Sequence, residues 1–281
     1  MISLGSLALP DRPSIVSIDL DGTLLDSAGV LRPRSRNAVL GLIERDVRVA
    51  IATARPARAV AQLLDREIVE AIDLVHVDGA VVDHRGDEHP RHQRPLPDGA
   101  AQAIADLASH ALPEARVIVE LEGWEFGSDR PGTTEELWKY NSATPDMVLP
   151  VAAAVERTPV KIAINGINAS VAGLAELLAR ELGDRVRLLH HREGTFLSVV
   201  APGVGKRSGV ARLLGNDAAQ WQSAVAFGDD YSDIELLDAC GFSFAMANAT
   251  PEVLAAARHR APANDDDGVA QVLEVLIGQL D

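Results

Sequence analysis

An apolar strand that runs directly into two aspartates constrains this chain more than any other feature. Residues 15–18 are apolar apart from one serine and lead into Asp19, and Asp21 and Gly22 follow at once. Such a run is typical of a buried parallel strand that delivers a functional group to its end. In an extended chain Asp19 and Asp21 would share a face, and Gly22 would let the chain turn. Two like charges held so close predict a bound cation, and a plain acidic turn is the alternative.

Apolar strands alternate with helical patterns on both sides of the chain's middle section. Before it, further apolar runs cover residues 47–51 and 74–77, with helical patterns between the strands. After it, a helical pattern covers residues 206–214 and a strand covers residues 224–227. This order predicts an α/β fold with a Rossmann-like, doubly wound parallel sheet. The strand ends of such a sheet form the crevice where ligands bind.

The middle section follows a different rhythm. Two hairpins are expected there, one turning at Gly123 and one at residues 192–194, and helical patterns lie among them. Hairpins interspersed with helices predict an antiparallel sheet covered by helices. We therefore expect an inserted α+β cap domain over residues 84–201, and a core formed by residues 1–83 and 202–281.

Charge and composition exclude several classes of partner. The formal net charge is −15, which disfavours binding to nucleic acid or to an anionic membrane surface. No apolar run of about 18 residues is present, so we expect no membrane span. The single cysteine, Cys240, allows no intrachain disulfide, and the first residues lack the pattern of a secretory signal. We therefore expect a cytoplasmic protein, and the sequence assigns it no oligomeric state.

Four features at strand ends or in loops of the core resemble the four motifs of the haloacid dehalogenase superfamily. In the family's order along the chain they are the Asp19/Asp21 pair, Thr53, Lys206 and the Asp229/Asp233 cluster. The finer resemblance is to the Cof-type branch, phosphatases with a large α/β cap between the second and third motifs. Supporting stretches lie at residues 52–55, 203–206, 245–249 and 267–270. The similarity covers nearly the whole core, whereas the insert matches only in length, position and pattern.

The resemblance implies a role for each carboxylate. Asp19 would be the nucleophile that forms an aspartyl-phosphate, and Asp21 would act as general acid and then general base. Mg²⁺ would be held by Asp19, Asp229 and the main-chain carbonyl of Asp21. Asp233 would be a further metal ligand or would orient the metal's waters.

The remaining motif residues would bind the phosphoryl group. Thr53 would donate a hydroxyl hydrogen bond, Lys206 would supply positive charge, and the backbone amides from Leu20 to Gly22 would add a small anion cradle. The implied function is a Mg²⁺-dependent phosphatase for a small phosphorylated metabolite, such as a sugar phosphate or a phosphorylated cofactor. A phosphomutase with the same intermediate and a non-catalytic phosphometabolite-binding protein are the alternatives.

Three positions depart from the family's usual pattern. Ala54 stands where glycine is usual, Asp78 where asparagine is common, and Ser232 where the last motif usually has asparagine. The change at Ala54 bears on packing. The changes at Asp78 and Ser232 remove amides near the site, which bears on substrate positioning more than on the basic chemistry.

Several of these side chains also have purely structural alternatives. Thr53 would cap the helix that begins near Pro56, Lys206 would be a solvated first-turn lysine, and Asp233 would favour the start of the following helix. Asp230 is expected to be solvated rather than catalytic.

Two further groups of ionisable residues are expected to be structural. Asp265, Asp266 and Asp267 predict a capping loop more than a metal site. Histidines cluster in one part of the sequence, but their spacing matches no zinc pattern, which favours surface positions for His76, His84, His89 and His92.

Overall fold

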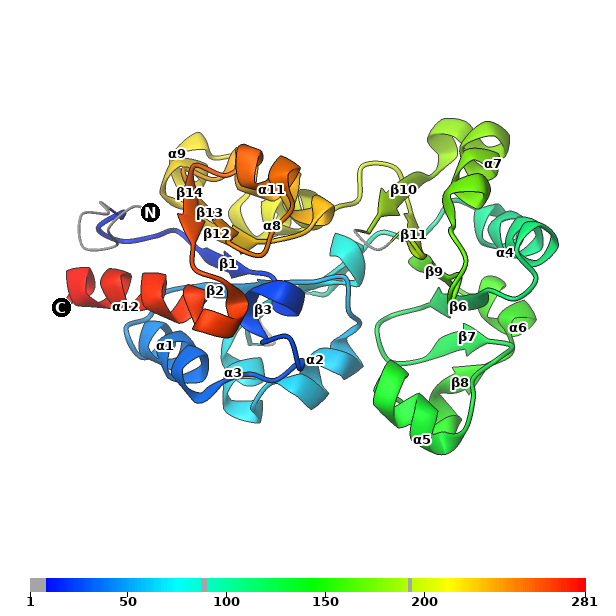
Figure 1. The fold of residues 1–281 in the computed structure, drawn as a ribbon, viewed down its shortest axis with the longest axis horizontal. Helices are drawn as coiled ribbons and strands as arrows, with labels where there is room; N and C mark the ends of the chain where they lie inside the picture. Colours follow the sequence, from blue (N-terminus) through cyan, green and yellow to red (C-terminus); the bar gives the residue numbers. More distant parts are fainter. Residues whose placement is uncertain (1–8, 87–89, 192–193) are drawn as a thin grey trace.

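The computed structural model describes residues 9–86, 90–191 and 194–281. These residues form two α/β units that lie side by side, each built on its own sheet (Figure 1). The two ends of the chain belong to the first unit, and the middle of the chain, drawn largely in green, forms the second. His89 and the turn residues 192–193 lie outside the described residues.

The first unit is organised around a sheet with the strand order β14-β13-β12-β1-β2-β3-β4-β5 in the described part of the chain. The strands from β14 to β3 are parallel, β4 is antiparallel to β3, and β5 at the edge is antiparallel to β4. The expected Rossmann-like parallel sheet is therefore confirmed. Its strands are β1 (Val16–Ile18), β2 (Val49–Ala52), β3 (Asp73–His76), β4 (Val81–Asp83), β5 (His92–Gln93), β12 (Val225–Gly228), β13 (Phe242–Met246) and β14 (His259–Ala261).

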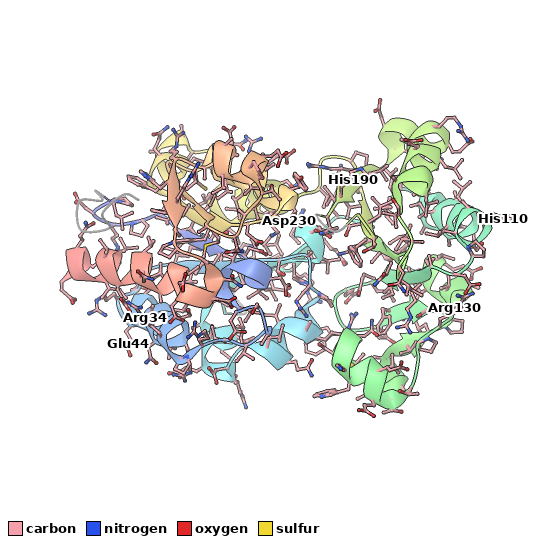
Figure 2. All side chains as sticks on the ribbon, viewed as in Figure 1. Arg34, Glu44, His110, Arg130, His190 and Asp230 are labelled. Atoms are coloured by element: carbon pink, nitrogen blue, oxygen red, sulfur yellow. The ribbon has the colours of Figure 1, made fainter. Side chains whose placement is uncertain are left out.

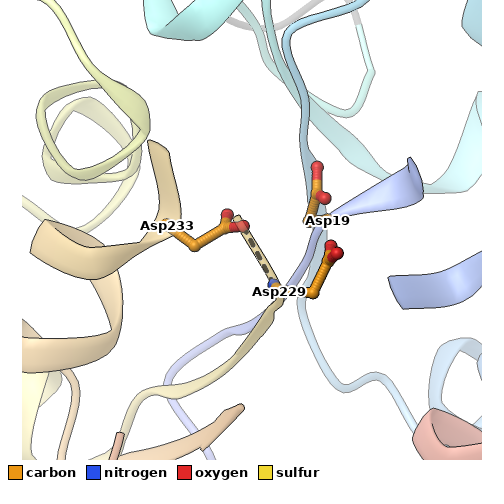
Figure 3. Close-up of side chains that lie close together, drawn as sticks. All are labelled: Asp19, Asp229 and Asp233. Carbon is orange, nitrogen blue, oxygen red and sulfur yellow. Dashed lines mark hydrogen bonds between the residues drawn. The ribbon is translucent and has the colours of Figure 1, made fainter. Parts of the chain in front are cut away.

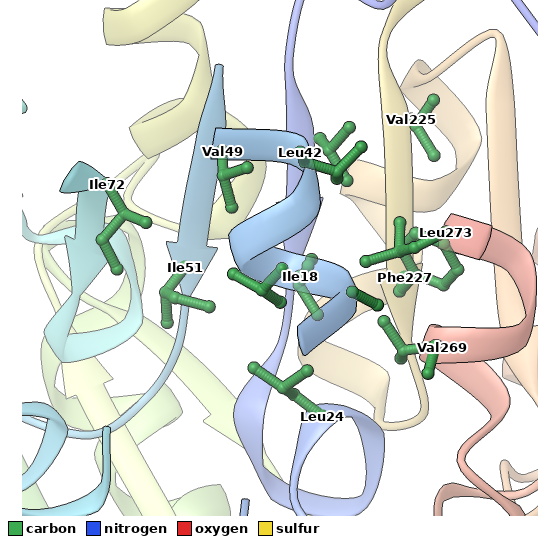
Figure 4. Close-up of a cluster of buried hydrophobic side chains, with 14 of the residues drawn as sticks. Ile18, Leu24, Leu42, Val49, Ile51, Ile72, Val225, Phe227, Val269 and Leu273 are labelled. Carbon is green, nitrogen blue, oxygen red and sulfur yellow. The ribbon is translucent and has the colours of Figure 1, made fainter. Parts of the chain in front are cut away.

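Helices cover both faces of this sheet because its strands are apolar on both sides. On one face α1 and α12 pack together, and Leu42, Phe227 and Leu273 lie in the apolar layer beneath them (Figure 4). On the other face a second apolar layer, which includes Val75 and Val210, lies under α8, α10 and α11. The helices of this unit are α1 (Pro33–Glu44), α2 (Ala57–Leu63), α3 (Arg66–Ala71), α8 (Lys206–Leu214), α9 (Ala218–Ser223), α10 (Ile234–Ala239), α11 (Pro251–Ala256) and α12 (Gly268–Leu280).

The second unit is a mixed, mostly antiparallel sheet with most of its helices packed on one face. Its strands, in the order β10-β11-β9-β6-β7-β8, are β6 (Arg116–Glu120), β7 (Phe126–Ser128), β8 (Val148–Leu149), β9 (Lys161–Asn165), β10 (Arg187–His190) and β11 (Phe196–Val200). Its helices are α4 (Ala100–Ala111), α5 (Thr134–Glu136), α6 (Val151–Val155) and α7 (Ala172–Leu182). Side chains alternate along β9, so Ile162 and Ile164 pack under the helices while Lys161 and Ala163 line a cavity beside the first unit.

The short strands and one histidine differ from the sequence-based expectation. β4, β5 and β14 are only two or three residues long, too short to give an alternating pattern, and none was predicted. β5 follows residue 84 in the chain and still pairs with β4 in the first sheet, and the domain boundary at residue 84 stays a prediction. The expected surface position of His76 is wrong: the side chain is fully buried at the end of β3, with Nε2 3.2 Å from an Asp83 oxygen. Burial lowers the pKa of this imidazole.

No described helix is long and apolar enough to cross a membrane. Even α12, with 13 residues, is about 20 Å long, well short of a hydrocarbon layer about 30 Å thick.

Two buried ion pairs join the two units. Arg58, on α2, donates from both terminal nitrogens to the two oxygens of Glu120, on β6, at 2.8 and 2.7 Å. Lys161, on β9, donates to Asp78 at 2.6 Å and to the Ala54 carbonyl at 2.9 Å. All four charged side chains are buried. Asp78 stands where the family commonly has asparagine, and this change was expected to affect substrate positioning. In the structure Asp78 lies in a contact between the two units.

One glycine lets the chain after β3 approach the start of α8. Gly79 has φ +88°, and a Cβ there would lie 2.2 Å from the Gly205 carbonyl oxygen. Gly205 directly precedes Lys206, the first residue of α8. The absence of a side chain at residue 79 therefore sets how closely this helix start can pack.

We expect Gly79→Ala to destabilise the protein by about 1–3 kcal/mol more than Gly29→Ala, because overpacking adds about that much to the backbone strain that the two variants share. Gly29 is a matched control, since its φ is +74° and a Cβ there would meet nothing within 4 Å. Urea unfolding of both variants measures the difference. Equal losses would show that the Gly79 contact carries no constraint.

We expect Asp78→Asn to cost about 3–5 kcal/mol at pH 7, because it leaves the Lys161 ammonium buried without its carboxylate. Burial opposes ionisation of Asp78, but Lys161 and His191 outweigh it, so the pKa of Asp78 is lowered. Its ionised form therefore contributes stability above the unfolded-state pKa of about 3.9, and loses that contribution as the pH falls through the lower folded-state pKa.

Urea unfolding across this pH range would show the wild type and Asp78→Asn converging below about pH 4. The exposed Asp184 offers a control, since Asp184→Asn removes a carboxylate outside the interface. A cost for Asp78→Asn that matches the control, or a gap that persists at low pH, would contradict the assignment.

Candidate functional site

Three of the expected site residues follow neighbouring parallel strands. Asp19 follows β1, Thr53 follows β2 and Asp229 follows β12, and β1 pairs with the other two strands in parallel. In this register Ile18 lies opposite both Ile51 and Phe227. The strand ends therefore bring these three residues to one edge of the sheet, where parallel sheets bind ligands.

Three carboxylates form a buried cluster at this edge. Asp19, Asp229 and Asp233 each offer an oxygen, and these atoms lie within 4.8 Å of one another (Figure 3). All three side chains are buried. Asp229 also accepts a hydrogen bond from the Thr23 hydroxyl at 3.0 Å. At this separation two carboxylates repel by about 3.5 kcal/mol at an effective dielectric of about 20, so the cluster needs compensating positive charge.

Lys206 supplies one such charge. Its Nζ lies 2.7 Å from an oxygen of Asp19 and 2.7 Å from an oxygen of Asp233. The solvated position considered for this lysine is wrong, because the side chain is buried. Burial disfavours the ammonium, but attraction by Asp19 and Asp233 outweighs it and raises the pKa of Lys206 above its ordinary value.

The cluster nevertheless keeps a surplus of negative charge. Three carboxylates and one ammonium leave two negative charges when all are ionised. Burial raises the pKa of Asp19 well above its ordinary value; Lys206 opposes this, and Asp233 and Asp229 add to it. An all-oxygen donor set with two surplus charges fits a hard divalent cation such as Mg²⁺.

Asp233 also fixes the loop that carries Asp229. One of its oxygens accepts hydrogen bonds from the backbone amides of Asp229 and Asp230, both at 3.1 Å, while the other faces Lys206. Asp233 directly precedes α10, the helix that it was expected to favour, but its side chain makes no capping hydrogen bond to that helix. The same side chain takes part in the cluster.

A tight turn places the backbone after Asp19 against Asp229. Residues Leu20–Leu24 form this turn, in which Gly22 has φ +72°. A Cβ on Gly22 would lie 2.4 Å from an oxygen of Asp229, so only glycine fits there. The predicted anion cradle at the amides of Leu20 to Gly22 stays a prediction.

Asp21 lies apart from the buried cluster and pairs with an arginine that the sequence did not single out. Its two oxygens accept from Arg55 Nε and a terminal nitrogen at 2.6 and 2.7 Å, and about half of the side chain is exposed. The hydrogen bond to Asp21 raises the pKa of Arg55, although burial of the guanidinium acts in the opposite direction. Arg55 lies two residues after Thr53, so the 52–55 stretch contained the signal.

Thr53 is buried at the end of β2. Its hydroxyl oxygen accepts from the Arg55 amide at 3.1 Å, which leaves the hydroxyl proton to donate elsewhere. The residue before α2 is Pro56, and no side chain caps that helix, so the capping alternative for Thr53 is not the arrangement found.

Two asparagine side chains form hydrogen bonds with backbone carbonyls in and directly after this turn. Asn248 donates to the Gly22 carbonyl at 2.8 Å, and Asn264 donates to the Leu25 carbonyl at 2.9 Å. Asp265 accepts from the Ser27 amide, and Asp267 precedes α12. None of the residues 265–267 belongs to the described cluster of carboxylates.

A cavity of about 320 Å³ opens beside Asp21, between the two units. The first unit contributes Arg55 and Arg58, and β11 contributes Phe196. Asp230, expected to be solvated, instead lies on the side of the first unit that faces the second (Figure 2), with an oxygen 3.4 Å from His191 Nδ1. Burial opposes its ionisation, but hydrogen bonds from His191 and the Tyr231 amide lower the pKa of Asp230.

Comparison with known proteins agrees with this arrangement. The family model for haloacid dehalogenase-like hydrolases matches residues 16–273. The 5-amino-6-(5-phospho-D-ribitylamino)uracil phosphatase YitU of Bacillus subtilis is 22% identical over 94% of this chain and 97% of its own length. Its Escherichia coli counterpart YbjI is 33% identical, over 42% of this chain and 43% of its own. An HMP-PP phosphatase of Escherichia coli is 25% identical over 87% of this chain and 88% of its own.

Solved structures share the whole fold. A haloacid dehalogenase-like hydrolase from Bacteroides thetaiotaomicron superposes with a TM-score of 0.79 at 20% identity, over 94% of this chain and 99% of its own. The HAD subclass IIB sugar phosphatase BT4131 gives 0.75 at 18% identity, over 92% and 97%. The resemblance drawn from the motifs, including the Cof-type branch, is thereby confirmed. The chain belongs to the haloacid dehalogenase-like hydrolase family.

Proposed function

We propose that this protein is a Mg²⁺-dependent phosphatase that hydrolyses a small phosphorylated metabolite through an aspartyl-phosphate at Asp19. The observation that carries the proposal is the buried cluster of Asp19, Asp229 and Asp233 around Lys206. A site that only bound phosphate would have no need of carboxylates in surplus, because they repel the ligand. A nucleophile with its cation does need them.

In this proposal Asp19 attacks phosphorus and the ester oxygen leaves. Lys206 already contacts an Asp19 oxygen, so its ammonium is positioned to offset negative charge on the phosphoryl oxygens. Thr53 would donate its hydroxyl proton to the same group, and the amides of Leu20 and Gly22 would add donors. Asp21 would protonate the leaving oxygen and then deprotonate the water that cleaves the aspartyl-phosphate.

Asp19, Asp229 and the main-chain carbonyl of Asp21 would hold the Mg²⁺, and Asp233 would be a further ligand or orient its waters. When bound, Mg²⁺ would offset the repulsion between the nucleophile and the phosphate dianion. The donor set supports this, since every candidate ligand is an oxygen and the described cluster carries two surplus negative charges.

The cavity beside Asp21 supports a small leaving group. Its volume of about 320 Å³ lies at the low end of the range for metabolite sites, and polar and aromatic side chains line it together. We propose that the predicted insert, residues 84–201, acts as the cap that closes this cavity and excludes water. The names of the relatives suggest a phosphorylated ribitylaminouracil and HMP-PP as test substrates.

We expect phosphate release from a panel of sugar phosphates and phosphorylated cofactors, including those two compounds, with Mg²⁺ and not with EDTA. Asp19→Asn should reduce turnover by at least about a thousandfold, because it removes the nucleophile itself. Asp238→Asn is the control, an exposed carboxylate on α10 outside the cluster. Full turnover by Asp19→Asn would disprove the nucleophile assignment. Formation of an isomerised sugar phosphate without free phosphate would indicate a phosphomutase. Binding of the esters without release of phosphate would indicate a non-catalytic binding protein.

Arg55→Gln should lower kcat by about 10- to 100-fold, with a smaller change in KM, because Asp21 loses the fork that orients its carboxylate. Arg36→Gln provides the control, because Arg36, on α1, also pairs with a carboxylate, that of Asp65, but does not line the cavity beside Asp21. Steady-state kinetics with the best ester of the panel measures both. An unchanged kcat in Arg55→Gln would show that the Arg55 pair does not position Asp21 for the reaction.

A further inference from the structure

A second cavity lies where the chain crosses between the two units. Its volume is about 230 Å³, and its lining includes His92, Arg94, Gly203, Ser208 and Arg212. Arg94 belongs to the segment that leaves the first sheet after β5, and Gly203 belongs to the segment that returns before α8. None of the lining residues belongs to the carboxylate cluster.

The cavity presents two guanidinium groups that lack carboxylate partners among the described residues. Arg94 and Arg212 are exposed and take part in none of the described ion pairs. Elsewhere arginines pair closely: Arg34 binds both oxygens of Glu274, for example. The chain has 41 acidic and 26 basic residues, so carboxylates are in excess. Arg94 and Arg212 are two of the arginines without a carboxylate partner among the described residues, and both line this one cavity.

A half-buried imidazole reports the positive potential of this cavity. Burial lowers the pKa of His92, and the charges of Arg212 and Arg94 lower it further. Both guanidiniums therefore act on the same point. Two cationic side chains that line one cavity attract an anion to it.

The residue types favour a phosphate-bearing ligand over other anions. Guanidinium groups bind phosphate oxygens through paired hydrogen bonds, which a compact ammonium cannot reproduce. Ser208 lies in the first turn of α8 and Arg212 in its last turn, so both side chains are fixed to one helix. The Ser208 hydroxyl is already bonded to Gly205, so the two arginines are the main donors.

We propose that this cavity is a second anion site, which binds the phosphate group of a small molecule with Arg94 and Arg212. The site is independent of the proposed phosphatase activity, because it shares no residue with the cluster. An anion held there contacts α8, which carries Lys206, and lies against both crossing segments. Its occupancy thus links the crossing region to the helix that completes the carboxylate cluster.

The test follows the His92 imidazole signal by NMR while inorganic phosphate or phenylphosphonate is added in the presence of EDTA. The signal is assigned by its loss in His92→Gln. We expect a saturable shift, with affinity at least about tenfold weaker in the Arg94→Gln/Arg212→Gln double variant. Arg260→Gln is the matched control, since Arg260 is exposed, has no described ion pair and lies on β14 at the opposite edge of the sheet. Its affinity should match the wild type.

A His92 signal that does not respond to either anion would overturn the proposal, as would a double variant that binds as tightly as the wild type. Tighter binding of phenylphosphonate than of phosphate would identify an organic phosphate as the ligand, and the reverse order would identify free phosphate. Both substitutions are at exposed side chains, and thermal unfolding verifies that the double variant is folded. Loss of phosphatase activity bears on neither outcome, because the readout is binding.

Discussion

The buried ammonium of Lys206 is the interaction on which the site depends. It lies 2.7 Å from Asp19 and from Asp233, and so links the end of β1, the start of α8 and the loop after β12. Without it three buried carboxylates would repel one another with no protein cation among them. The ammonium can reach them only because α8 begins close to the chain after β3, where Gly79 leaves room for the Gly205 carbonyl. The close approach of the backbone at Gly79 and the ion pairs of Lys206 thus both determine the position of the ammonium.

Contacts between the two units also rely on charge. Glu120 and Lys161 come from the second sheet, and each meets a buried partner, Arg58 or Asp78, from the first unit. Apolar contacts tolerate sliding, whereas a buried ion pair tolerates little, since an unpaired buried charge is costly. The pairs therefore define one relative orientation of the units. Both pairs also involve cations that line the cavity beside Asp21, Arg58 and Lys161. Because each of these cations is bound to a carboxylate, neither is free to bind an anion in that cavity.

The sequence predicts what depends on local pattern and misses what depends on distant partners. Apolar runs with a functional residue at the end locate β1, β2 and β12, and hence Asp19, Thr53 and Asp229. The two-residue strand β5 carries no readable period, so its pairing was missed. The burial of His76 depends on the fold around β3, and the role of Arg55 depends on Asp21, 34 residues away in the chain. Arg55 lies in the 52–55 stretch that supports the family resemblance, but nothing in the sequence identifies Asp21 as its partner or shows that His76 is buried.

The distribution of positive charge explains where anions can act on so acidic a protein. With a net charge of −15, long-range attraction is unfavourable, and screening limits it to about 8–10 Å at ordinary ionic strength. An anion must therefore meet a local cation. Lys206 is such a cation but is held by two carboxylates, and Arg58 and Lys161 are committed to the contact between the units. Arg94 and Arg212 carry no such commitment among the described residues. In the described part of the chain, the crossing region thus offers an anion two donors that are not already bound to a carboxylate.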